Sequence, residues 1–342
     1  MQKTIPVEQA VGMVLPHDIT RISKTKDFKG PAFRKGHIIS QEDVPLLKDL
    51  GKEHIYVLEL GAEDIHENEA AAILAGSLAG EGVRVEGEPV EGKLSIVADC
   101  DGLLKINIAS LYEFNLLGEV MCATLHNNTP VKQGTQVGAT RLIPLVGNRE
   151  LVSKAAEIAA TQGGIISVSK LPKRKAGLVI TGSEVFHGRI EDAFEAVLRD
   201  KLAEIGSEVV KVSFAPDDID IIADEIANCL KAGADLIITS GGMSVDPDDV
   251  TRLGIKKAGA TEITYGSPVL PGAMFLVGYI GDIPVIGIPA CGMFHRITIL
   301  DLVLPRILTG EKIGRQELAA MGHGGLCRQC KTCKYPVCDF GK

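Results

Sequence analysis

Between residues 177 and 240, short apolar segments alternate with longer amphipathic ones. The segments 177–180, 209–214 and 236–239 are apolar or β-branched, as expected of buried strands. The segments 192–205 and 219–230 place their apolar residues on one helical face. Strands that alternate with helices imply right-handed crossovers and a parallel sheet. The sequence therefore predicts an α/β fold with three layers, in which helices cover both faces of a parallel sheet.

Polar residues follow each of these three predicted strands. The sequences are TGSE (181–184), APDD (215–218) and SGGMSVDPDD (240–249). The carboxyl ends of parallel strands share one edge of a sheet, where ligands of open α/β folds bind. We therefore expect the three segments to converge on one site.

The segment 236–251, LIITSGGMSVDPDDVT, carries the most chemistry. Glycine lets a ligand approach the backbone closely, and hydroxyl and N–H groups can donate hydrogen bonds to an anion. Asp246, Asp248 and Asp249 add carboxylates of the kind that hold magnesium beside a phosphate. A purely structural interpretation is equally open: Asp246 can be a helix N-cap, with Pro247 at the first helical position. The two interpretations are compatible.

The charge balance points to a small anionic ligand. The 342 residues include 36 basic and 44 acidic side chains, for a net charge of -8, and no basic cluster is interleaved with aromatics. We therefore expect neither nucleic acid nor a membrane as a partner. The N-terminus shows no export signal, and residues 269–294 contain prolines and glycines that favour two buried strands over a spanning helix. A cytoplasmic location is expected.

The chain divides into four predicted regions. Residues 1–60 are expected to form an α+β unit, in which Ser40 caps a helix over 40–50 and a strand covers 54–60. Residues 61–172 form a strand-rich insert. Residues 173–315 form the α/β domain, and residues 316–342 form a cysteine-rich tail. Within the insert, the pattern predicts helices from Glu63 and over 151–161, and strands over 83–85, 94–98, 120–125 and 136–145.

The tail has four cysteines within 12 residues. Cys327, Cys330, Cys333 and Cys338 follow the spacing C-x2-C-x2-C-x4-C. A reducing cytoplasm disfavours disulfides, and four thiolates at this spacing can close around one metal centre. The spacing approaches that of bacterial ferredoxins without matching it, so zinc and an iron–sulfur cluster both remain open. Cys100, Cys122 and Cys229 are interpreted as small core residues.

The order of these motifs resembles a known family. TGSE, PDD, TSGGMSVDPDDVT, PGAM and GIPAC, between Lys173 and Lys312, resemble the molybdopterin-binding domain of molybdopterin adenylyltransferases and gephyrin-type molybdopterin molybdenumtransferases. The segment KGHIISQEDVPLLKDLGKEHIYV also resembles the piece that directly precedes this domain in the molybdenumtransferases. Here about 110 residues separate the two.

The resemblance implies roles for particular residues. It assigns catalysis to Glu184, Asp218 and Asp249, which would gather a magnesium ion, Glu184 and Asp249 as its ligands, around a phosphoanhydride and the incoming molybdate. The pterin phosphate, or its adenylate, would lie between two lips of the pocket. The implied cofactor-binding residues are Thr181, Gly182, Ser183, Ser240, Gly241, Gly242, Met243, Ser244, Asp246, Pro271 and Gly272.

Some positions depart from the family pattern. Ser183 stands where the transferases carry an aspartate, and Ala273 replaces a phosphate-binding lysine in the proline-glycine-lysine-proline motif. PACG, with Cys291, replaces a glycine-asparagine-proline turn, and the acidic glycine-tyrosine motif of their N-terminal domain has no match.

Two functions therefore stand side by side. The first is Mg-dependent insertion of molybdate into adenylylated molybdopterin, with hydrolysis of the adenylyl group. The second is a non-catalytic cofactor binder, a chaperone or sensor, that uses its cysteines for partner docking or electron transfer. Adenylyl transfer from ATP is weaker, because the chain has no separate nucleotide motif. A molybdoenzyme partner and a homo-oligomer are expected from the resemblance alone.

Overall fold

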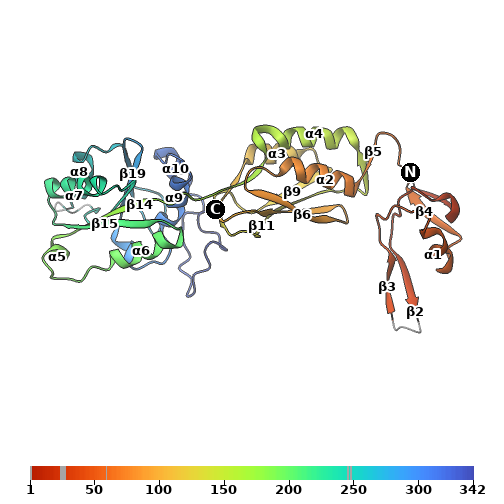
Figure 1. Cartoon of the computed structure of the whole chain (residues 1–342), viewed down its shortest axis with the longest axis horizontal. Coiled ribbons are helices and arrows are strands. Elements are labelled where there is room, and N and C mark those ends of the chain that lie inside the picture. Colours follow the sequence, from red (N-terminus) through yellow and green to blue (C-terminus); the bar gives the residue numbers. More distant parts are fainter. Residues whose placement is uncertain (1, 24–27, 59, 245, 247–248) are drawn as a thin grey trace. The chain divides into compact units, whose positions relative to one another are not determined.

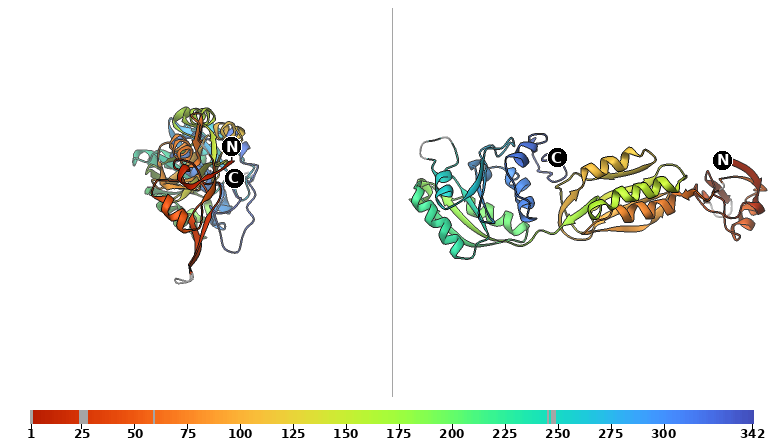
Figure 2. Two further views of the ribbon diagram at one scale, coloured as in Figure 1. Left: turned by 90° about the vertical axis from the view of Figure 1, so that its right-hand side faces the viewer. Right: turned by 90° about the horizontal axis from the view of Figure 1, so that it is seen from above.

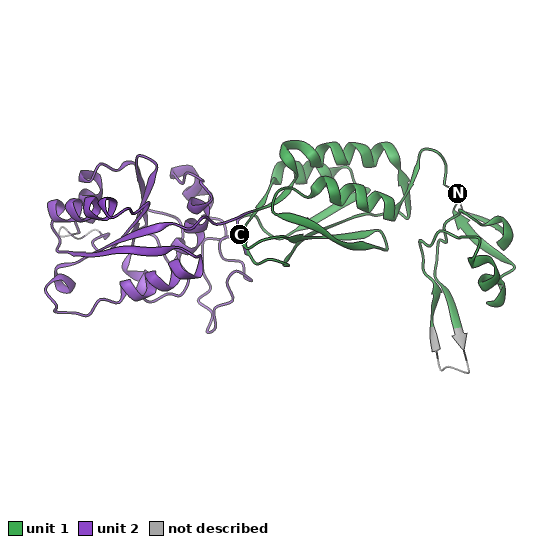
Figure 3. Ribbon diagram, in the orientation of Figure 1, with its two compact units in different colours: residues 1–127, 131–168 green, residues 128–130, 169–342 purple. Residues whose placement is uncertain are grey.

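The computed structural model describes residues 2–23, 28–58, 60–244, 246 and 249–342. The chain forms two compact units (Figure 3). Unit 1 comprises residues 1–127 and 131–168, and unit 2 comprises residues 128–130 and 169–342. Pro247 and Asp248, both named in the predicted site, lie outside the described residues.

Unit 2 is built on a six-stranded sheet (Figure 1). The strand order is β15-β14-β16-β19-β18-β17. The strands are β14 (Lys175–Thr181), β15 (Glu208–Ala215), β16 (Leu236–Ser240), β17 (Thr261–Tyr265), β18 (Leu276–Ile280) and β19 (Ile283–Ile288). The strands predicted over 177–180, 209–214 and 236–239 are confirmed as β14, β15 and β16.

The sheet is parallel on one side only. Strand β14 pairs in parallel with β15 and β16, and β16 pairs in parallel with β19. Strands β18 and β17 are antiparallel additions. The expectation of a wholly parallel sheet is wrong for these two strands. A single tight turn, Gly281 and Asp282, joins β18 to β19. Two residues are too few for the crossover helix that a parallel pair would need.

Helices cover both faces of this sheet, which confirms the three layers. On one face, α6 (Phe194–Glu204) and α9 (Ile299–Leu308) pack Leu198 and Val303 against Leu178 and Ile238 of the strands. On the other face, α7 (Ile219–Lys231) and α8 (Thr251–Lys257) supply Ile222, Ile226 and Ile255. The alternation of apolar residues along β14 and β16 explains the two cores, because successive side chains point to opposite faces. The two layers of helices can be followed in Figure 2.

The middle part of unit 1 has its own core, between a four-stranded sheet and α2 and α4. The sheet contains β6 (Val83–Val90), β7 (Lys93–Ala98), β11 (Gln136–Leu142) and β9 (Val120–Thr124). The predicted strands are thus confirmed, but β8 (Gly102–Ile106) and α3 (Ile108–Leu116) were not predicted. The other elements are β5 (Asp64–His66), α2 (Glu67–Leu78), β10 (Pro130–Val131), β12 (Val146–Asn148), α4 (Arg149–Ala160), η2 (Thr161–Gly163) and β13 (Ile166–Ser169).

Two predicted helix starts are wrong. The helix expected from Glu63 begins at Glu67, because Asp64–His66 pairs with β12 as a strand and His66 becomes the N-cap. The helix expected from Ser40 is α1 (Asp43–Asp49). Ser40 does not cap it; instead its N–H and hydroxyl donate to Asp43 Oδ2, at 2.8 Å each.

The N-terminal part of unit 1 is small and mostly strands. It contains β1 (Gln2–Pro6), η1 (Val7–Gln9), β2 (Ile19–Ser23), β3 (Phe28–Phe33) and β4 (His54–Leu58). In unit 2, the remaining helices are α5 (Ser183–Phe186), η3 (Ala290–Met293) and α10 (Arg315–Ala320). In the part of the chain that the structure describes, no helix has both the length and the apolar character needed to cross a membrane.

Candidate functional site at the strand ends of unit 2

The strand registers bring the predicted segments to one edge of the sheet. Thr181 at the end of β14 lies opposite Ala215 of β15, and Ser240 of β16 lies opposite Ile180 and Ile288. TGSE, APDD, SGGM and PACG therefore follow four neighbouring parallel strands. This confirms that the predicted segments share one edge of the sheet, as parallel order requires. That they form one binding site stays a prediction.

Buried hydroxyl groups connect these strand ends. The Thr181 hydroxyl donates to the Ser240 carbonyl oxygen at 2.8 Å, and its Oγ1 lies 2.8 Å from Thr251 Oγ1. All three residues are buried. Two strands and the start of α8 are thus tied together at one point.

The same hydroxyls explain the two glycines of the loop. Gly241 has a φ of +84°, and a Cβ there would lie 2.3 Å from the Thr181 carbonyl oxygen. At Gly242, with a φ of +57°, a Cβ would lie 2.2 Å from Thr251 Oγ1. Only glycine tolerates both the conformation and the close approach. The chain's own packing therefore requires these glycines, in addition to any ligand.

Two of the three predicted catalytic carboxylates accept backbone hydrogen bonds. Asp249 Oδ2 accepts from the Ser244 N–H at 2.7 Å, which closes the loop 244–249. Asp218 Oδ1 accepts from the N–H groups of Asp220 and Ile221, at 2.8 and 3.0 Å, and caps α7. The third, Glu184, lies in the short helix α5. Among the described residues, no three His, Cys, Asp or Glu side chains form a group that could hold a metal ion.

Asp217 joins two strand ends and was not singled out from the sequence. Its Oδ2 accepts the Ser183 N–H at 2.8 Å, and its own N–H donates to Ser183 Oγ at 3.2 Å. This reciprocal pair fixes the loop after β14 to the loop after β15. The sequence offered one sign of this role. APDD contains two adjacent aspartates, and because Asp218 is the N-cap of α7, Asp217 is left for another contact.

The other predicted cofactor residues differ in accessibility. The Met243 side chain is buried in the core against Gly287, and only its backbone carbonyl faces Tyr265. Ser240 is also fully buried, and its hydroxyl has no hydrogen-bond partner among the described residues. Pro271 and Gly272 lie in the loop before β18, where Gly272 contacts Ile299. The Cys291 thiol is half-buried, and burial raises its pKa.

A groove of about 870 Å³ adjoins the loop, between α8 and β17. Asp246 and Asp249 line it together with Arg252 and Lys256. The Arg252 guanidinium lies 4.3 Å from the centroid of the Tyr265 ring, a cation–π contact. The Tyr265 hydroxyl donates to the Met243 carbonyl oxygen at 2.6 Å, which ties the groove to the loop.

Sequence reasoning missed this groove. The sequence feature that could have indicated it is the pair Arg252 and Lys256, four residues apart in TRLGIKK and therefore on one helix face, directly after the acidic run. The remaining lining residues are Val250, Leu253, Ala260, Thr261, Glu262, Ile263 and Leu276. The site therefore presents carboxylates at the strand ends and cations beside them, a combination suited to an anion that carries a metal.

Comparison with known proteins bears on the same region. Residues 177–309 match a family model described as "Probable molybdopterin binding domain", and residues 4–59 match a domain of unknown function (DUF8806). A CinA-like protein of Thermosipho melanesiensis is 37% identical over 92 residues, 27% of this chain. One from Mycobacterium avium is 38% identical over 77 residues, 22% of this chain. The matches span only 23% and 18% of those two proteins.

Solved structures show more distant similarities. The molybdopterin biosynthesis enzyme MoaB of Thermus thermophilus is 20% identical, with a TM-score of 0.32; the match covers 40% of this chain and 98% of that one. The molybdopterin biosynthesis MoeA protein of Pyrococcus horikoshii is 15% identical, with a TM-score of 0.35, and the match covers 91% and 75% of the two chains. Residues 177–309 are thus similar to molybdopterin-binding domains by their family match, and neither structure assigns them an activity.

Proposed function

We propose that unit 2 binds molybdopterin, or its adenylate, at the strand ends of β14, β15 and β16, and that the chain takes part in molybdenum cofactor biosynthesis. The observation that carries this proposal is the groove that adjoins Asp246 and Asp249 after β16, within the region that matches the molybdopterin-binding family model. The groove would take the anionic group, because the ends of β14 and β15 do not line it. Arg252 and Lys256 supply positive charge in the groove, and the chain has Ala273 at the lysine position of the family's proline-glycine-lysine-proline motif.

One donor of this segment already has a partner. Ser244, which the resemblance places against the phosphate, donates its N–H to Asp249 in this structure. A phosphate that takes this N–H would displace the Asp249 carboxylate, which would then be free to bind a cation beside the phosphate.

The residues present fit a magnesium ion shared with the ligand. Magnesium is usually bound through one or two carboxylates, together with substrate phosphates and water, and seldom in an all-protein cage. Asp246 and Asp249 lie together on the groove wall, while the described residues form no three-ligand group of their own. When bound, magnesium would neutralise phosphate oxygens and orient the displacement. The protein residues would hold the reactants in place.

The proposed reaction is Mg-dependent insertion of molybdate with release of AMP. Glu184 and Asp249 would position the metal, with Asp218 at the neighbouring strand end. Asp218 already caps α7 through two hydrogen bonds, which favours a positioning role. This structural engagement of Asp218 and Asp249 also supports the second candidate, a non-catalytic carrier that passes cofactor to a molybdoenzyme. A homo-oligomer remains a prediction.

Release of AMP from adenylylated molybdopterin distinguishes the two. The full chain is incubated with the adenylate, molybdate and magnesium, and ligand binding is measured in parallel. Release that requires both molybdate and magnesium supports the transferase. Saturable binding without release supports the carrier, and the absence of binding contradicts both.

The matched variant is Asp249→Asn. Its amide oxygen can still accept the Ser244 N–H, so the loop can stay closed while the charge is lost. We expect binding in the absence of magnesium to persist and AMP release to fall at least about 100-fold, the usual scale for loss of an electrostatic catalytic group. Unchanged release would remove Asp249 from the metal site.

A further inference from the structure

The cysteine-rich tail after α10 is an irregular segment without a core of its own. Residues 322–342 contain no helix or strand beyond an isolated bridge between Leu326 and Leu270. All four tail cysteines are free thiols. Cys327 and Cys338 are half-buried against the core of unit 2, whereas Cys330 and Cys333 are exposed.

The two ends of this segment are fixed to the same part of unit 2. The Leu270 N–H donates to the Gly325 carbonyl oxygen at 2.8 Å, and the Cys327 N–H donates to the Leu270 carbonyl oxygen at 2.9 Å. At the other end Phe340 is buried, and the Gly341 N–H donates to the Gly324 carbonyl oxygen at 2.9 Å. The segment between Cys327 and Cys338 is therefore a closed loop.

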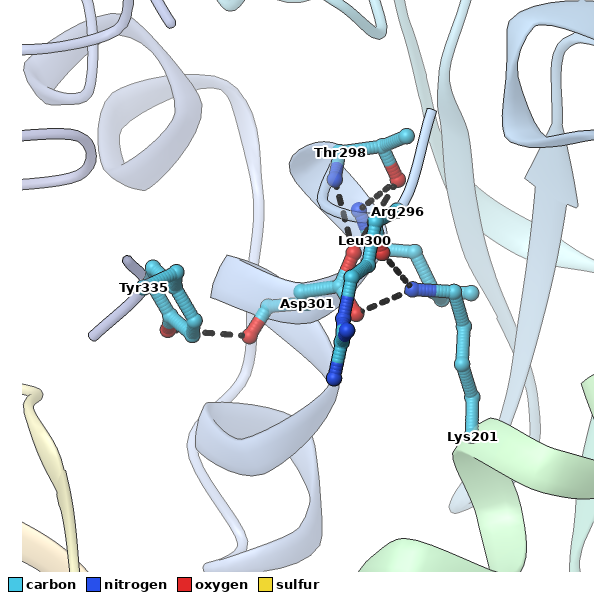
Figure 4. Close-up of polar contacts among 6 residues, drawn as sticks. All are labelled: Lys201, Arg296, Thr298, Leu300, Asp301 and Tyr335. Atoms are coloured by element: carbon cyan, nitrogen blue, oxygen red, sulfur yellow. Dashed lines mark hydrogen bonds and ion pairs between the residues drawn. The ribbon is translucent and has the colours of Figure 1, made fainter. Parts of the chain in front are cut away.

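Helix α9 holds the middle of the loop. The Tyr335 hydroxyl lies 3.5 Å from the Asp301 carbonyl oxygen, and the Asp301 carboxylate pairs with Lys201 at 2.5 Å (Figure 4). Lys201 also donates to the Arg296 carbonyl oxygen at 2.6 Å. Cys338, three residues after Tyr335, is thus held close to the domain, while the segment 328–334 remains exposed.

The backbone around Cys327 is arranged for a thiolate. The Gln329 N–H points at Cys327 Sγ, with the nitrogen 3.5 Å from the sulfur, and Gln329 has a φ of +52°. A non-glycine residue in this region is uncommon and is worth a functional explanation. Here the turn aims an N–H at a sulfur and returns the chain to Cys330. Hydrogen bonds to ligand sulfurs are a recurring feature of metal–thiolate centres.

Charges in the loop favour an anionic centre. Arg328, Lys331 and Lys334 are interleaved with the cysteines, and all three are exposed. Arg328 pairs with Asp339 at 2.7 Å. Four thiolates around a divalent metal carry a net negative charge, which these cations would offset.

We propose that Cys327, Cys330, Cys333 and Cys338 bind one thiolate-ligated metal centre, either a zinc ion or an iron–sulfur cluster. The described residues form no ready ligand group of three, so binding must draw the exposed thiols of Cys330 and Cys333 toward Cys327 and Cys338. This site is independent of the proposed pterin function, because its residues are separate from the loop 241–249 and the groove.

Metal analysis of the full chain, purified anaerobically, tests the proposal. We expect about one zinc per chain or about four irons with acid-labile sulfide. Cobalt(II) substitution would give thiolate charge-transfer absorption for a zinc site, and visible absorption of the purified protein would mark a cluster. Either result supports the site and identifies its metal.

Cysteine variants locate the centre. Cys330→Ser and Cys333→Ser alter exposed thiols, so folding should be preserved. We expect metal affinity to fall more than the about tenfold lost with a residue that only hydrogen-bonds to a ligand, because a coordinating sulfur is removed. Cys100→Ser, a half-buried cysteine of unit 1, is the control and should retain full metal content. The proposal is overturned if purified and reconstituted protein stays metal-free, or if metal affinity, measured by competition with a chelator, is unchanged in the tail variants. Disulfides between the tail cysteines would overturn it as well.

Discussion

Residues 241–244, 246 and 249 and the tail loop 327–338 lie outside helices and strands, and both carry the chemistry of unit 2, but they are held in different ways. In the first, Ser244 donates to Asp249, Tyr265 holds Met243, and the buried Thr181–Thr251 pair lies beside the two glycines. The tail loop is fixed at its ends, while two of its thiols face solvent. We infer that contacts within the protein hold the described residues of the first segment, whereas the tail loop needs a ligand to complete it.

The largest effect is expected at Gly242. Gly242→Ala places a Cβ 2.2 Å from Thr251 Oγ1 at a positive φ, so we expect a loss of about 3 kcal/mol in the free energy of unfolding. Urea denaturation measures it. The control is Gly233→Ala, which shares a positive φ but has nothing within 4 Å, and should cost about 1 kcal/mol. Equal losses would mean that the hydroxyl contact does not shape the loop.

A smaller loss is expected at Thr181. Thr181→Val keeps the shape of the side chain but leaves the Ser240 carbonyl and the Thr251 hydroxyl without their partner, at a cost of about 2 kcal/mol. The half-buried Thr309 donates to Arg306 at a helix end, so Thr309→Val serves as the control with a smaller loss. If the two variants behave alike in thermal unfolding, the buried hydroxyl pair is unimportant.

Substitutions in the groove should weaken ligand binding and leave folding unchanged. Arg252→Ala and Lys256→Ala should each weaken binding of a pterin phosphate about fivefold, or about 1 kcal/mol, and the difference should shrink with added salt. Lys257→Ala is the adjacent control, since Lys257 pairs with Asp220 and does not line the groove. Affinities that do not separate the first two variants from the control would exclude the groove as the anion site.

The next prediction concerns unit 1, whose free energy of unfolding should depend on pH through His66. Burial lowers the pKa of His66, against the partly opposing hydrogen bond to Gly36. A folded-state pKa below the unfolded value means that the unfolded chain takes up the proton first. The stability of unit 1 is therefore full above the unfolded pKa and declines as the pH falls toward the folded one. Chemical denaturation between pH 7.5 and 5 should show this decline, and His66→Gln should flatten it. An equally steep decline in the variant would assign it to other groups.

The smallest change in the free energy of unfolding is expected for tail cysteine variants in the metal-free protein. Without metal, Cys330→Ser and Cys333→Ser should change the free energy of unfolding by less than about 0.5 kcal/mol, because exposed thiols make few contacts. The same variants should abolish any stabilisation by bound metal. A loss above 1 kcal/mol in metal-free protein would show that the tail loop is internally tied after all.

The sequence predicted those helices and strands whose pattern of apolar residues fits only one kind of structure. Strands β14, β15 and β16 and helices α6 and α7 followed from periodicity, and the shared edge followed from parallel order. Of the two antiparallel strands, β18 lies within 269–294, where two buried strands were predicted and β18 and β19 are found. Strand β17 (Thr261–Tyr265, TEITY) was not predicted, because it is short and half-exposed and pairs only with β18.

The site was predicted as a set of residues but not as a geometry. Sequence reasoning found Asp218 and Asp249, yet their backbone partners depend on loop conformations that no periodicity encodes. It also treated Met243 as a pocket residue, whereas that side chain is buried in the core after the turn through Gly241 and Gly242. Arg252 and Lys256 were missed because a helix face and a distant edge strand must meet to form the groove.

Equilibrium binding of molybdopterin to the full chain tests the central claim most directly. We predict saturable binding that tightens with magnesium, weakens in Arg252→Ala and is unchanged in Lys257→Ala. Saturable binding that is indifferent to both magnesium and Arg252 would place the pterin elsewhere. No binding at all would contradict the claim that the strand-end loops of unit 2 form a molybdopterin site.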